Sequence, residues 1–184
     1  NENNYKCRVE KGFFFSFKVF VLIYIFLLSF TLLHGDASGG EWEERRINVG
    51  YKLFPSFLAA DININKKQGE DGKLLLLVLY SDKLQFADSL AQELSDTGSV
   101  RNILLNVQAV AIGDLPQYKN RKVAGLFISQ QIPDDIDTII NFARVQNAII
   151  FSPFKGDVEK GISCGFSVTD RVVPFINISE LQIS

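Results

Sequence analysis

The chain has 184 residues, a formal net charge of −2, one histidine and two cysteines. Since no basic excess is present, we do not expect nucleic acid as a partner. The shortage of histidine and cysteine argues against a metal centre and against Ser-His-Asp or Cys-His catalysis. No glycine-rich nucleotide loop is present either, so we expect no cofactor and no enzymatic activity.

The beginning of the chain has the pattern of an export signal. Four basic residues precede an unbroken apolar run, Val19 to Leu33, and small residues follow it up to Ala37. We therefore expect residues 1–37 to be a cleaved signal peptide or, if residues 13–33 stay in the bilayer, an uncleaved signal anchor. Either alternative places residues 38–184 across a membrane as one domain. If the signal is not cleaved, residues 13–33 are the only expected membrane contact.

Export also limits the chemistry of the remaining domain. A cleavage after Ala37 removes His34, and Cys7 leaves with the signal or stays on the other side of the membrane. Cys164 then has no partner for a disulfide within the chain. The missing initial methionine and the stop at Ser184 suggest a sequence clipped at both ends.

The first elements of the domain are a helix and two strands. Apolar spacing over residues 45–60 predicts a helix that Pro55 kinks or restarts. The alternation of Ile62 and Ile64 with asparagines predicts a short strand. Residues 74–80 are continuously apolar, which indicates a strand buried on both faces, as in a parallel sheet covered by helices.

Strand and helix patterns then alternate. They predict a helix from Leu84 to Leu94, a strand over 103–112, a loop over 113–120, a strand over 123–128, a helix that begins at Pro133 with Asp134, Asp135 and Asp137 in its first turn, and a strand over 148–151. Residues 161–168 and 172–178 flank a tight turn and predict an antiparallel hairpin. The expected fold is therefore α/β, with a mostly parallel sheet flanked by helices and a C-terminal antiparallel β-hairpin.

Polar residues that follow three of these strands are candidate ligand-binding residues, because ligands bind at the carboxyl ends of strands in open α/β sheets. They are Ser81, Asp82, Ser129, Gln130 and Ser152. Helix caps and turns explain the same residues equally well.

The first helix offers a candidate surface for a partner protein. Tyr51, Phe54 and Phe57 are more aromatic residues than one amphipathic face requires, although all three can also belong to the core. Cys164 is either a small buried hydrophobe or a redox-sensing or intermolecular thiol.

The last third of the chain resembles the YfiR family of exported α/β proteins. The strongest match is Glu159–Asn177, which has the family's glycine, β-run, turn and second β-run closing on phenylalanine and Ile-Asn. The segments Val49–Phe57, Val123–Ser129 and Ala148–Ser152 are similar to the family's first helix and two of its strands. The resemblance covers about residues 46–184.

The resemblance implies a periplasmic regulator. The best-known member of the family holds a membrane diguanylate cyclase inactive by contacting its periplasmic sensor domain. Two features depart from the family. Ala59-Ala60-Asp61 stands where the family usually has Trp-Pro, and the redox disulfides of some members cannot form with Cys164 alone. The family's additional C-terminal helix is also missing from this sequence.

Three classes of function stay open at this point. The expected one is a regulator that docks on a membrane cyclase or sensor kinase, with a second copy of the chain as a further partner. The alternative is a periplasmic small-molecule binding module, such as a solute-binding component of a transporter. An enzyme that uses two carboxylates is the third.

Overall fold

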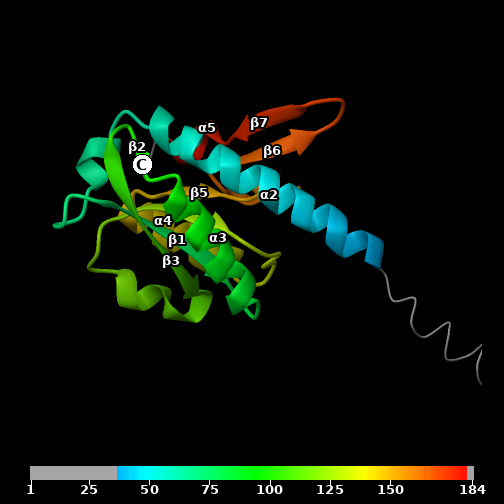
Figure 1. Cartoon of the computed structure of the whole chain (residues 1–184), viewed down its shortest axis with the longest axis horizontal. Coiled ribbons are helices and arrows are strands. Elements are labelled where there is room, and N and C mark those ends of the chain that lie inside the picture. The colour runs from blue at the N-terminus through cyan, green and yellow to red at the C-terminus, as the bar shows by residue number, and fades with distance from the viewer. Residues whose placement is uncertain (1–36, 182–184) are drawn as a thin grey trace, which may run out of the picture. The chain divides into compact units, whose positions relative to one another are not determined.

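The computed structural model describes residues 37–181 (Figure 1). The first 36 residues, which include the expected export signal and Cys7, lie outside this range. The chain divides into two units after Trp42, and the sheet with its helices belongs to the second, Glu43–Ser184. The elements are α2 (Ala37–Ala60), η1 (Ile64–Lys67), β1 (Leu74–Tyr80), α3 (Leu84–Asp96), β2 (Ser99–Val100), β3 (Ile103–Ala111), η2 (Ile112–Tyr118), β4 (Val123–Ile128), α4 (Ile136–Gln146), β5 (Ile149–Phe151), η3 (Val158–Lys160), β6 (Cys164–Val168), β7 (Val172–Ile176) and α5 (Ile178–Leu181).

The strands form a seven-stranded, mostly parallel sheet in the order β2-β3-β1-β4-β5-β6-β7. All pairs from β3 to β6 are parallel, and β2 and β7 are added antiparallel at the two edges. The chain crosses from β1 to β3 in one direction and from β4 to β5 in the other. Because such crossovers are right-handed, α3 and α4 cover opposite faces, as Figure 1 shows. The predicted α/β fold is confirmed.

The central strands are buried on both faces, which explains their unbroken apolar sequences. Leu76 on β1 and Phe127 on β4 are both 0% exposed, as the sequence predicted. The strands β1 and β4 have the predicted bounds, and the strands expected over 103–112 and 148–151 are one residue shorter.

Helix α2 packs against the sheet beside α3 (Figure 1). The ring of Phe54 lies 5.8 Å, centroid to centroid, from those of both Phe127 and Phe151. Gly125 on β4 permits this close approach, since a Cβ atom there would lie 2.7 Å from Cζ of Phe54. The hydrogen bond between Tyr51 and Glu93, which raises the pKa of Tyr51, connects α2 with α3.

In two places the local structure differs from the prediction. Pro55 does not restart the helix, since α2 continues through it from Ala37 to Ala60; its missing N–H removes only one backbone hydrogen bond from a helix held by its buried face. The strand expected at Ile62 and Ile64 is a turn and the 3-10 helix η1, since the carboxylate of Asp61 accepts the N–H of Asn63 (2.8 Å) and closes the chain into a turn. Ile62 is 87% exposed.

Two further segments differ from the expectation. The loop predicted over residues 113–120 is mostly the 3-10 helix η2. Helix α4 begins at Ile136 rather than at Pro133, so Asp134 and Asp135 precede it and Asp137 alone lies in its first turn.

The predicted C-terminal hairpin is confirmed, with β6 and β7 shorter than the expected strands. Thr169 donates its N–H to the carbonyl of Arg171, and Asn177 donates its N–H to the carbonyl of Ser163. These two bonds establish which opposite residues of β6 and β7 are hydrogen-bonded pairs and which are not. Pro174 pairs with Phe166 at a position without ladder hydrogen bonds. The nitrogen of Pro174 therefore faces away from β6, toward the edge of the sheet, as the sequence predicted.

Candidate functional site

The structure brings two of the predicted ligand-binding residues together. Asp82 follows β1 and Gln130 follows β4, and these strands are neighbours. The side-chain amide of Gln130 donates to Oδ1 of Asp82 at 2.6 Å. This is the point where the strand order changes direction, which is where open α/β sheets bind their ligands.

The side chain of Gln130 occupies the backbone N–H groups that a ligand would need at this place. Its Oε1 accepts the backbone N–H groups of Asp82 (3.4 Å) and Lys83 (3.2 Å), immediately before α3. The hydroxyl of Ser129 donates to the carbonyl of Leu79 at 2.7 Å. These polar groups hold the loop after β1 against the end of β4, and Ser81 is exposed beside them. The arrangement fits loop anchoring better than ligand binding.

Ser152 belongs to a separate cluster at the end of β5. Its hydroxyl donates to Oδ2 of Asp157 at 2.6 Å and accepts the N–H of Phe154 at 3.1 Å. Both Ser152 and Asp157 are buried, and Lys160 lies 3.6 Å from Oδ1 of Asp157. The hydroxyl therefore orders the segment between β5 and η3 and is not presented to solvent.

The structure places the three aromatic residues predicted as a partner surface at different depths. Phe54 is fully buried, so its prediction as a docking residue is wrong. Tyr51 and Phe57 are half-buried and pack against the core, where the ring of Phe57 lies 5.2 Å from that of Phe151. The rings of Phe54 and Phe57 pack on Phe127 and Phe151, which form an aromatic part of the sheet face under α2.

Cys164 does not have the environment of a redox thiol. It is buried in β6, and burial raises its pKa to about 12. A neutral, shielded thiol reacts slowly with oxidants, because the thiolate is the reactive form. Of the two alternatives for Cys164, burial favours the small buried hydrophobe.

Neither a metal centre nor a membrane span is found in residues 37–181. No group of three or more potential metal ligands occurs there. None of the helices in this part of the chain is both long and apolar enough to cross a bilayer.

The apolar surface of the hairpin is a feature that the sequence analysis did not identify. Every residue of β7 is exposed, including Val172 (43%), Val173 (40%), Phe175 (47%) and Ile176 (46%). Because side chains alternate along a strand, these residues expose apolar groups on both faces of β7. The apolar run by itself indicates only a strand, and the absence of charge from Val172 to Ile176 was the available signal for an exposed surface.

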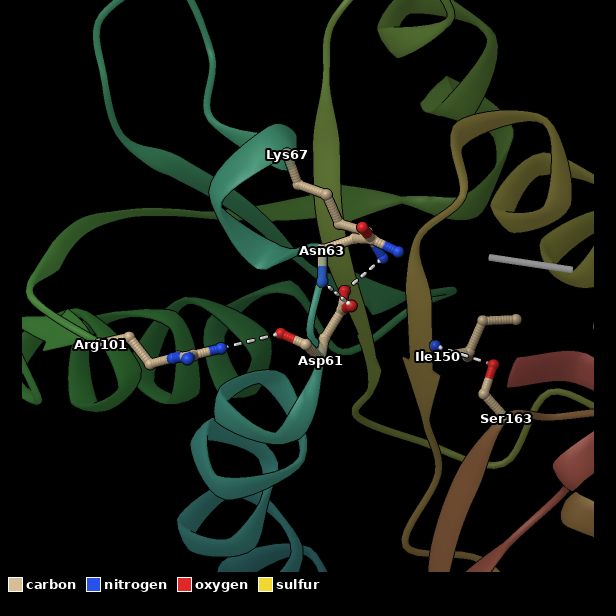
Figure 2. A network of polar contacts seen from close by, with 6 residues as sticks. All are labelled: Asp61, Asn63, Lys67, Arg101, Ile150 and Ser163. Carbon is tan, nitrogen blue, oxygen red and sulfur yellow. Dashed lines mark hydrogen bonds and ion pairs between the residues drawn. The ribbon is translucent and has the colours of Figure 1, made fainter. Parts of the chain in front are cut away.

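A second unpredicted feature is a buried ion pair after α2, shown in Figure 2. The ammonium group of Lys67 lies 2.7 Å from Oδ2 of Asp61. Oδ1 of Asp61 accepts the N–H of Asn63, and its backbone carbonyl accepts Nη1 of Arg101 at 3.2 Å. The same view shows the hydroxyl of Ser163 accepting the N–H of Ile150 at 3.3 Å. The contacts of Asp61 with Asn63 and Lys67 hold η1 against the turn that follows α2.

Comparison with known proteins adds no assignment: no family model matches the chain, and no significantly similar curated protein is found.

Proposed function

We propose that this protein is an exported, non-enzymatic regulator that docks on the periplasmic domain of a membrane signalling protein, either a cyclase or a sensor kinase. The observation that carries the proposal is the apolar surface of β7, exposed on both faces at the edge of the sheet. Contiguous apolar surface of this kind on a folded domain is typical of a protein–protein interaction site.

The details of the hairpin favour a side-chain interface over continuous strand addition. Pro174 faces the free edge and provides no donor there, which interrupts the backbone ladder that another strand would need. Val173 and Phe175 share one face of β7, and Val172 and Ile176 share the other. A partner groove that encloses the strand can bury both sets.

The sequence supports the remaining parts of the proposal. The export pattern of residues 1–37 supports a periplasmic location, and the resemblance of Glu159–Asn177 to YfiR-like regulators includes the hairpin itself. The single histidine and the buried Cys164 leave few groups for catalysis in residues 38–184.

The alternative of a small-molecule binding module at the carboxyl ends of the strands has less support. Gln130 occupies the N–H groups of Asp82 and Lys83, and Ser152 is bonded to Asp157. A ligand that bound there would first have to displace these internal hydrogen bonds.

The test is capture from membranes of the cells that make the protein. The full chain should recover a cyclase or a sensor kinase that mass spectrometry identifies. The double variant Val173→Ser/Phe175→Ser should lose it while the domain stays folded, since both side chains are partly exposed and lie outside the core. Leu104→Ser is the matched control, because Leu104 is an exposed residue of β3 near the other edge of the sheet.

Capture of a permease alone, or equal recovery of the signalling protein by the double variant, would reject docking through β7.

A further inference from the structure

A hollow of about 390 Å³ lies at the opposite end of the sheet from the predicted ligand residues, where η1, the start of β4 and the end of α4 meet. Its volume is in the range of small-ligand sites. It is lined by Asn63, Lys66, Lys67, Lys122, Val123, Gln146 and Asn147.

The charges around this hollow are one-sided. Three lysines and three amides line it, and none of the lining residues is a carboxylate. The ion pair with Asp61 neutralises the charge of Lys67. The net positive charge of the hollow therefore comes from Lys66 and Lys122, neither of which forms an ion pair in the described part of the chain. Nζ of Lys122 makes one long contact, 3.4 Å to the carbonyl of Lys66, and keeps donors for other acceptors.

Lys67 is a buried lysine beside the hollow whose ammonium donors are not all used by the protein. Its side chain is 7% exposed and lines the hollow. Its ammonium group is paired with Oδ2 of Asp61, but no other acceptor in residues 37–181 contacts it (Figure 2). Because an ammonium group has three donors, a buried one with a single partner is a position where water or a ligand oxygen is expected.

The C-terminus of α4 does not oppose an anion here as strongly as an uncapped helix end would. Asn147 adopts the left-handed conformation (φ 54°), and its N–H donates to the carbonyl of Arg144. Ala148 donates to the carbonyl of Ala143 at 2.9 Å. Two carbonyl groups in the last turn of α4, those of Ala143 and Arg144, are therefore already capped.

We infer that this hollow binds a small phosphate-type oxyanion, either inorganic phosphate or the phosphoryl group of a small metabolite. The ammonium groups of Lys66 and Lys122 donate directly to the oxyanion, and the amide of Asn147 lies at the same rim. The site is separate from β7 and does not depend on the proposed docking function.

The experiment is calorimetric titration of the full chain with inorganic phosphate and with glycerol 3-phosphate at fixed ionic strength. Saturable binding of at least one of them is expected, with acetate and chloride giving none. The double variant Lys66→Gln/Lys122→Gln should weaken binding at least about tenfold, because two charge-assisted hydrogen bonds are lost. Its thermal stability should not change, since both side chains are exposed.

The matched control is Lys52→Gln/Lys83→Gln, which removes the same charge from two exposed lysines outside the hollow. Tighter binding of glycerol 3-phosphate than of phosphate identifies a phosphorylated metabolite as the ligand class, and the reverse order identifies free phosphate. Three results overturn the inference: binding of neither phosphate compound, equal binding of acetate, or equal losses in the two double variants. Capture of the membrane partner by β7 is measured separately and is unaffected by any of them.

Discussion

Asp61 and Lys67 form an ion pair of 2.7 Å in which both side chains are at least nine-tenths buried. Removing one partner leaves the other charge buried and uncompensated, so Asp61→Asn should lower the free energy of unfolding by about 3–5 kcal/mol. The double variant Asp61→Leu/Lys67→Met should cost less than the single one, because apolar groups can replace a buried pair. Urea denaturation of both variants measures this, and a larger loss in the double variant would contradict it.

The contact between α2 and β4 depends on Gly125. A Cβ atom there would lie 2.7 Å from Cζ of Phe54 and 2.9 Å from Cδ2 of Leu58. Gly125→Ala should therefore destabilise the protein by about 1–3 kcal/mol through overpacking. Gly113→Ala is the control, since nothing lies within 4 Å of a Cβ atom at that exposed position. Equal melting temperatures of the two variants would show that α2 can move away from the sheet without cost.

The guanidinium group of Arg46 connects α2 with the segment after β5 and with strand β6 of the hairpin. Nε and Nη2 donate to the carbonyl of Pro153 at 2.9 and 2.7 Å, and the group lies 4.9 Å from the centroid of the Phe166 ring. Arg46→Lys keeps the charge but loses the two-pronged hydrogen bond, which we expect to cost about 1.5–3 kcal/mol. Amide hydrogen exchange in β6 should accelerate more than exchange in β1. Uniform acceleration throughout the sheet would instead indicate that Arg46 contributes only to global stability.

The thiol of Cys164 should make stability sensitive to alkaline pH. Burial raises its pKa from 9.0 to about 12. Ionisation of the thiol therefore favours the unfolded chain above pH 9, and this contribution to stability, complete below pH 9, is lost as pH rises toward 12. Cys164→Ala lacks this contribution, so the stability difference between the two proteins should shrink by at most about 1.4 kcal/mol per pH unit above pH 9. Chemical denaturation at pH 8 and pH 10.5 tests this, and a constant difference would argue against it.

The core strands could be predicted from the sequence because a strand buried on both faces has an unbroken run of apolar residues. The run Leu74–Tyr80 permits no amphipathic alternative, and the hairpin around Thr169–Arg171 has both a turn and two apolar runs. The turn at Asp61 could not be predicted in the same way. Its side chain closes the chain locally and also pairs with Lys67, so the alternation of Ile62 and Ile64 was misleading.

The candidate sites were harder to predict, because they depend on which strand ends are neighbours. Asp82 and Gln130 were correctly selected as strand-end residues. The sequence does not show, however, that Gln130 accepts the N–H groups of the loop after β1. The lysine-lined hollow joins η1, β4 and α4, and Gln146 is far from Lys66 in the sequence. Only the order of the strands in the folded sheet brings these distant residues together, and the sequence does not give that order.

The position of β1 has a consequence for how the protein is made. Within residues 37–181 it is the first strand in the sequence but the third in the sheet, and its neighbours β3 and β4 are synthesised later. During synthesis the seven apolar residues Leu74–Tyr80 therefore leave the ribosome before any strand can pair with them. Because parallel pairing between distant segments is slow, the nascent chain exposes an apolar segment that chaperones can bind until β4 has been synthesised. The same topology that places β1 in the interior of the finished sheet leaves it without a pairing strand until β3 has been made.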